Sequence, residues 1–139
     1  MKNIFFFLLL LSTAFIACEK EDDHDDDATD YHAHILSPDA SNKKVGDEIA
    51  IHVQFEDHNG GTVHHINVKI YNKANPSQVI YNKPDEAHVH ETSGEYDFTD
   101  TFKLDVDPHT DWVLEAKVWG HEDGVGEVSE TVEFHVHPH

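Results

Sequence analysis

Histidines separated by a single residue are the side chains of this sequence best suited to chemistry. The chain has 139 residues, of which 14 are histidine. The pattern His-x-His occurs at His32 with His34, at His88 with His90, and at His135 with His137, the last followed by His139 at the same spacing. On a β-strand, residues two apart point to the same face, about 6 to 7 Å from each other, so both imidazoles can reach one metal ion. Imidazole nitrogen suits zinc, copper or nickel better than calcium or magnesium, so the pattern predicts a site for a divalent transition metal, with zinc or copper favoured.

The elements that must position these histidines are short β-strands. From Tyr31 onward, apolar and polar residues alternate with a period of two, as in the run Ile49, Ile51, Val53 and Phe55. Segments rich in turn-forming residues, such as 57–61 and 120–126, separate these runs. About seven short strands at this spacing predict an all-β domain over residues 31–139, an immunoglobulin-like β-sandwich.

A sandwich of this kind places alternate loops at opposite ends, which brings distant histidines together. One end is expected to gather the main candidate ligands: His32, His34, His58, His64, His65, His88, His90 and His121. At the other end, the register of the last hairpin is expected to set His109 opposite His137 and Asp111 opposite His135. His109, His135 and His137 therefore form a second, smaller candidate group.

The first 17 residues have the pattern of a bacterial lipoprotein signal peptide. Lys2 precedes an apolar run over residues 4–11, and Ala17 precedes Cys18, the one cysteine of the chain. The segment before Cys18 resembles a lipobox, although Phe15 stands where leucine is usual. We expect cleavage before Cys18 and lipid attachment to its thiol, which makes a membrane the expected partner of this anchor.

Residues 18–30 form an acidic segment with too little apolar content to fold, and we expect a disordered linker. Its start, Cys18-Glu19-Lys20-Glu21-Asp22-Asp23, resembles the export signal of Bacteroidota lipoproteins, which implies the outer membrane and its outer face. An acidic run that only serves as a hydrated tether explains the same composition, so both interpretations stay open.

The overall charge restricts the partners. The formal net charge is -19, with 28 acidic residues against 9 lysines and no arginine. Nucleic acid is therefore excluded as an expected partner, and metal cations are favoured.

A family resemblance covers the whole predicted domain. It rests on Val45-Gly46-Asp47-Glu48-Ile49, on residues 55–61 with the following His64-His65-Ile66-Asn67-Val68, and on Gly120-His121-Glu122-Asp123-Gly124-Val125-Gly126 before the last strand. These segments resemble immunoglobulin-like domains of Bacteroidota lipoproteins, in particular the uncharacterised family DUF4625. The resemblance implies a lipobox followed by a histidine-bearing sandwich, and it implies no activity.

Enzymatic activity is not expected. No serine lies in a Gly-x-Ser-x-Gly turn. The run His88-Val89-His90-Glu91 is similar to the copper-site strand of Cu/Zn superoxide dismutase, but that family also needs a disulfide and an arginine. We therefore expect a non-catalytic metal-binding protein of the cell envelope.

Two alternatives stay open. The histidines can be incidental polar positions of a surface adhesion or carbohydrate- or protein-interaction module, or they can respond to mild acid. Trp112 is expected in the core, whereas Trp119, of opposite parity, is a candidate contact for a protein or glycan.

Overall fold

The computed structural model describes residues 29–139, which form nine β-strands and no helix. The strands are β1 (Tyr31–Ser37), β2 (Lys43–Lys44), β3 (Glu48–Asp57), β4 (Val63–Asn72), β5 (Val79–Lys83), β6 (His88–Glu91), β7 (Glu95–Lys103), β8 (Thr110–Trp119) and β9 (Val128–His137). The predicted signal peptide, Cys18 and most of the predicted linker lie outside the described residues. The described part includes no helix that would span a membrane.

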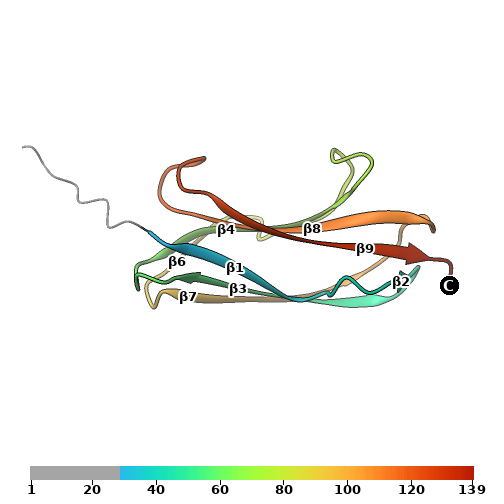
Figure 1. Ribbon diagram of the computed structural model, residues 1–139, viewed down its shortest axis with the longest axis horizontal. Coiled ribbons are helices and arrows are strands. Elements are labelled where there is room, and N and C mark those ends of the chain that lie inside the picture. The colour runs from blue at the N-terminus through green and yellow to red at the C-terminus, as the bar shows by residue number, and fades with distance from the viewer. Residues whose placement is uncertain (1–28) are drawn as a thin grey trace, which may run out of the picture.

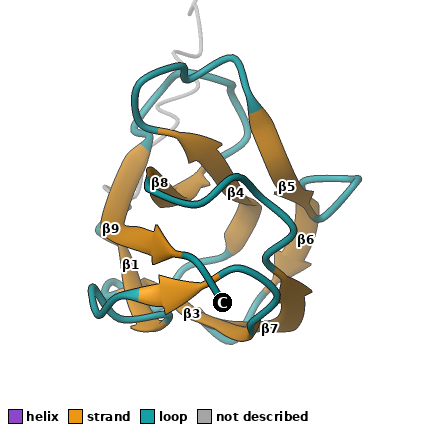
Figure 2. Ribbon diagram, turned by 90° about the vertical axis from the view of Figure 1, so that its right-hand side faces the viewer, coloured by secondary structure: helices purple, strands orange, loops and turns teal. Residues whose placement is uncertain are grey.

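The strands form two sheets that pack face to face. One sheet has the order β1-β3-β7, and the other has the order β2-β9-β8-β4-β5, with β6 also paired to β4. Figure 2 looks along the strands, with β3 and β7 at the bottom and β8, β4 and β5 above them. The predicted immunoglobulin-like β-sandwich is confirmed. The two-residue strand β2 had no hydrophobic pattern to predict it, because it exists only through its parallel pairing with the end of β9.

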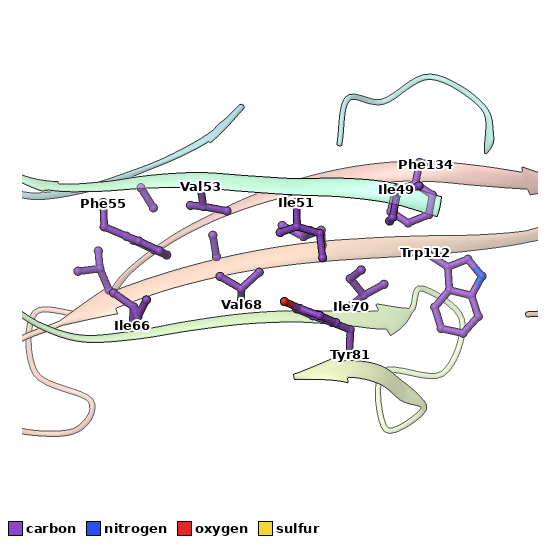
Figure 3. Close-up of a cluster of buried hydrophobic side chains, with 14 of the residues drawn as sticks. Ile49, Ile51, Val53, Phe55, Ile66, Val68, Ile70, Tyr81, Trp112 and Phe134 are labelled. Carbon is purple, nitrogen blue, oxygen red and sulfur yellow. The ribbon is translucent and has the colours of Figure 1, made fainter. Parts of the chain in front are cut away.

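Alternation along the long strands builds the core, as predicted. Ile51, Val53 and Phe55 of β3 are at most 1 % exposed, and Ile66 and Val68 of β4 are fully buried opposite them. Figure 3 shows these side chains between the two sheets. Burial of such side chains contributes about 1.5 to 3 kcal/mol each to folding, which is what holds the two sheets together.

Two further side chains reinforce the core. Trp112 is 1 % exposed, which confirms that it is a core residue. The hydroxyl group of Tyr81, in β5, donates a hydrogen bond of 2.7 Å to the Asp100 carboxylate, in β7. Burial and this hydrogen bond raise the pKa of Tyr81. The bond links the two sheets through a polar contact that keeps a buried hydroxyl satisfied.

The sandwich has two well-separated ends. At one end of β8, Trp119 is opposite His65 of β4, and at the other end Asp111 is opposite His135 of β9. Asp111 and Trp119 are eight positions apart on β8, which corresponds to about 26 Å at the rise of an antiparallel strand. In Figure 1, β6 and the start of β1 lie at the left end, and the C-terminus lies at the right end.

Candidate metal centre

Three histidines of β4 and β6 converge at the end of the six-stranded sheet where β4 begins, on the left in Figure 1. His64, His88 and His90 each offer one ring nitrogen, and these atoms lie within 4.8 Å of one another. Two ligands of one tetrahedral zinc ion, at bond lengths of about 2.0 to 2.1 Å, are about 3.4 Å apart. Small side-chain rotations therefore bring the three nitrogens onto one ion. We call this set the β4–β6 group.

The pairing of β6 with β4 places two of these ligands. His88 is opposite His65, and the register then shifts before Val63 meets Glu91, so β6 carries one extra residue. Within this irregularity His90 has a φ of 51°, a left-handed conformation that is unusual for a residue other than glycine. The rings of His88 and His90 lie 5.4 Å apart with their planes at 89°. The two rings therefore approach the same point from different directions.

The position of His64 results from a break in the alternation of buried and exposed residues at the start of β4. Val63 and Ile66 are three residues apart and both fully buried, so the residues between them cannot simply alternate. His64 and His65 are therefore adjacent in the chain and yet both contribute rings to one cluster, with centroids 6.2 Å apart.

His65 and His121 border the β4–β6 group. The ring of His121 lies 3.7 Å from that of His64, and the ring of His65 lies 4.9 Å from that of His88. The Nδ1 atom of His65 lies 2.6 Å from the carbonyl oxygen of Gly120. A carbonyl oxygen only accepts, so Nδ1 carries the proton and donates it, which leaves Nε2 with a lone pair for a metal.

The surroundings of His64 favour its neutral imidazole. His64 is 8 % exposed, and its Nδ1 atom is buried without a hydrogen-bond partner. Burial, and then the neighbouring rings of His121, His90, His65 and His88, lower the pKa of His64 from 6.5. His64 is therefore neutral near pH 7, which is the form that coordinates a metal.

The lowered pKa of His64 predicts a loss of stability in mild acid. Between the folded-state pKa and 6.5 the unfolded chain binds a proton that the folded chain does not, so the free energy of unfolding falls as the pH falls through this window. In metal-free protein with EDTA, His64→Gln should therefore lose less stability than the natural protein between pH 7.5 and 5.5. Urea unfolding at the two pH values measures this, and equal losses in both proteins would contradict it.

A second group lies on β1 and in the turn after β3. His32, His34 and His58 also offer ring nitrogens within 4.8 Å of one another. Tyr31 and Ala33 are buried, so His32 and His34 point outward from β1. We call this set the β1–β3 group.

Carboxylates already contact the β1–β3 group. Nε2 of His32 lies 3.1 Å from Asp30, and Nε2 of His58 lies 2.9 Å from Glu56. The rings of His32 and His58 are stacked at 3.9 Å with planes 19° apart. This group therefore offers mixed nitrogen and oxygen donors, or ion pairs when the rings are protonated. By contrast, the histidine–carboxylate pairs in residues 29–139 do not involve the five rings at the β4–β6 end.

The structure divides the eight histidines that the sequence analysis expected together. They do lie at the same end, but His32 and His34 belong to the three-stranded sheet and His58 to the turn after its strand β3, whereas the other five belong to the six-stranded sheet and its loops. The outer faces of two packed sheets point in opposite directions. The expected single gathering is therefore two groups, and of the five, His64, His88 and His90 are close enough to share an ion.

The smaller candidate group at the opposite end is brought together as expected. Asp111 is opposite His135 in the β8–β9 register. His109, His135 and His137 offer ring nitrogens within 4.8 Å of one another.

Several residues of these sites had no signal in the sequence. The Gly120 carbonyl is a backbone group, and Asp30 ends an acidic run in which no single carboxylate stood out.

Trp119, which the sequence analysis proposed as a contact for a protein or glycan, is half-buried. Its indole stacks on His65 at 5.3 Å and donates a hydrogen bond of 2.7 Å to Asp123. Trp119 therefore forms part of the wall of the histidine cluster.

Comparison with known proteins supports the fold, and the case for a metal site rests on the geometry of the histidines. No family model matches the chain, and no curated protein matches it. The solution structure of the CARDB domain of a Pyrococcus furiosus protein is similar, with a TM-score of 0.51 and 17 % identity over 78 % of this chain and 95 % of that chain. A crystal structure of that CARDB domain in complex with di-metal ions has a TM-score of 0.49 and 16 % identity over 80 % of this chain and 96 % of that chain. CARDB domains are immunoglobulin-like β-sandwiches. The fold and the site together define a β-sandwich domain with histidine groups that could hold metal ions.

Proposed function

We propose that this chain is a non-catalytic lipoprotein of the cell envelope that binds a divalent transition metal ion through His64, His88 and His90. The observation that carries the proposal is the convergence of three imidazole nitrogens within 4.8 Å on two neighbouring strands. Because these donors are all nitrogen, zinc and copper are the preferred ions. His65 and His121 supply further imidazoles beside the same position.

Two features of the β4–β6 group support a ligand role over an incidental one. The Nδ1 atom of His64 is buried without a partner, and leaving such a group unsatisfied costs about 1 to 3 kcal/mol. His90 has a left-handed backbone, which costs on the order of 1 to 3 kcal/mol for such conformations. Incidental polar positions on a solvated face have no reason to retain either cost, whereas a site that positions ligands does.

The surroundings of the site support binding without catalysis. His88 and His90 are exposed, so a metal here would lie near the surface, not in a closed pocket. Hydrolytic metal sites work in dry, shaped cavities. We therefore propose that this site binds and releases a metal ion without catalysing a reaction.

The anchor and the location come from the sequence. The lipobox-like segment ending at Cys18 supports a lipid anchor, and the acidic residues after it support export to the outer membrane. The resemblance to DUF4625 belongs to the same proposal. The strong negative charge of the chain would raise the local concentration of cations around the domain.

Calorimetry of the tag-free full chain tests the proposal. Titration with zinc or copper at pH 7.5 should give a dissociation constant of about 1 µM or tighter, and binding should be lost below about pH 6 because the imidazoles become protonated. Absence of binding by both ions would contradict the proposal and favour a surface interaction module with incidental histidines.

A further inference from the structure

We infer that the chain has a second, independent site for a divalent transition metal at the opposite end of the sandwich, formed by His109, His135 and His137 and oriented by Asp111. This inference does not depend on the β4–β6 group. Its ligands lie on the loop before β8 and at the end of strand β9, near the C-terminus in Figure 1.

The three rings are arranged to converge on one point. Their ring nitrogens lie within 4.8 Å of one another. The ring planes are inclined at 44° for His109 with His135, 87° for His109 with His137, and 67° for His135 with His137. The lone pair of an imidazole nitrogen lies in its ring plane, so rings inclined in this way can direct their lone pairs to one point from different sides.

Asp111 sets the tautomer of one ligand. Its Oδ1 atom lies 2.7 Å from Nδ1 of His135, directly across the β8–β9 pair. An ionised carboxylate only accepts hydrogen bonds, so Nδ1 of His135 carries the proton and Nε2 has the lone pair. A carboxylate that holds a histidine in this way is the usual outer partner of a metal-bound imidazole.

The backbone brings the third ligand over β9. His109 has a φ of 60°, and its N–H donates a hydrogen bond of 2.7 Å to the carbonyl oxygen of Val136. Val136 lies between His135 and His137, whose side chains point away from the core while Val136 is fully buried. The bond therefore fixes His109 beside both other ligands. Among residues 29–139, His90 and His109 are the residues other than glycine with a positive φ. His90 belongs to the β4–β6 group, and His109 belongs to the second site.

The two ends should bind separately. About 26 Å of β8 lies between them, so their ligands cannot reach a common ion. His109 is exposed and the other two rings are half-buried, so an ion held by three imidazoles would keep a coordination position open to water. The expected ion is zinc or another divalent transition metal that prefers nitrogen ligands.

Equilibrium dialysis of the tag-free full chain with zinc tests this inference. His135→Ala combined with His137→Ala should lower the stoichiometry by one zinc ion per chain. Asp111→Asn keeps all three ligands but weakens the orienting hydrogen bond, so we expect an affinity loss of about 10- to 100-fold at this site, measured by competition with a zinc chelator.

Two matched variants separate the outcomes. His139→Ala, an exposed histidine next to the site, should change nothing. His88→Ala combined with His90→Ala should remove an ion from the β4–β6 group and leave the second site intact, so each site can fail without the other. An unchanged stoichiometry in the His135/His137 variant, or an unchanged affinity in Asp111→Asn, would overturn the inference. If the double variant does not fold, Asp111→Asn decides.

Discussion

Replacing His88 and His90 together by alanine should weaken zinc binding at the β4–β6 group by more than about 100-fold. Loss of an outer partner of a metal ligand typically costs about 10- to 100-fold in affinity, and this variant removes two of three direct ligands. Both side chains are exposed, so the substitutions should leave the core unaffected. Calorimetry at pH 7.5 measures the affinity, and urea unfolding of the metal-free protein checks that the fold is retained.

A second His-x-His pair provides the matched control for this experiment. His32 and His34 have the same spacing on β1, but they lie on the other sheet and belong to the β1–β3 group. Their double replacement by alanine should leave the tightest binding step unchanged. Equal losses from the two double variants would show that the histidines bind ions diffusely, and would contradict a defined site at His64, His88 and His90.

Replacing Phe55 by alanine should lower the free energy of unfolding by about 3 to 5 kcal/mol. Phe55 of β3 is fully buried, and it lies between the two sheets in the same core cluster as Ile66 of β4. The substitution removes apolar surface from the core and leaves a cavity that the surrounding strands cannot fill completely. The free energy of unfolding of a native protein is about 5 to 15 kcal/mol, so this loss is a large part of the total stability. Urea unfolding in EDTA measures it without any contribution from bound metal.

An exposed apolar residue serves as the control for Phe55. Leu36 is 56 % exposed, so Leu36→Ala should change the stability by less than about 0.5 kcal/mol. Similar effects of the two substitutions would contradict the assignment of Phe55 to the core between the sheets.

The histidine groups differ in chemistry as well as in position. The β4–β6 group consists of imidazoles around one buried ring, the β1–β3 group already pairs with Asp30 and Glu56, and the group at the C-terminal end has one orienting carboxylate, Asp111. The first and third therefore suit transition metals held by nitrogen alone, whereas the second offers a mixed set of donors.

Local patterns in the sequence were enough to predict much of this architecture. Alternation in the run from Ile49 to Phe55 predicted a strand and its buried face, because a side chain on a strand can point only inward or outward. The spacing of His88 and His90 predicted a shared face for the same reason. The pairing of Asp111 with His135 was also predictable, because the two strands of a hairpin are adjacent in the chain and their turn restricts the register.

Only the tertiary structure decided which histidines share a site. Period-two alternation states on which face of its strand a residue lies, but it does not state to which sheet the strand belongs. It therefore could not separate His32, on β1, from His64, on β4, although their outer faces point in opposite directions. The left-handed backbone of His90 and the hydrogen bond from His65 to the Gly120 carbonyl arise where strands distant in the chain meet. Such contacts depend on the packing of the two sheets as a whole, and packing is a property of many residues together that no short segment carries.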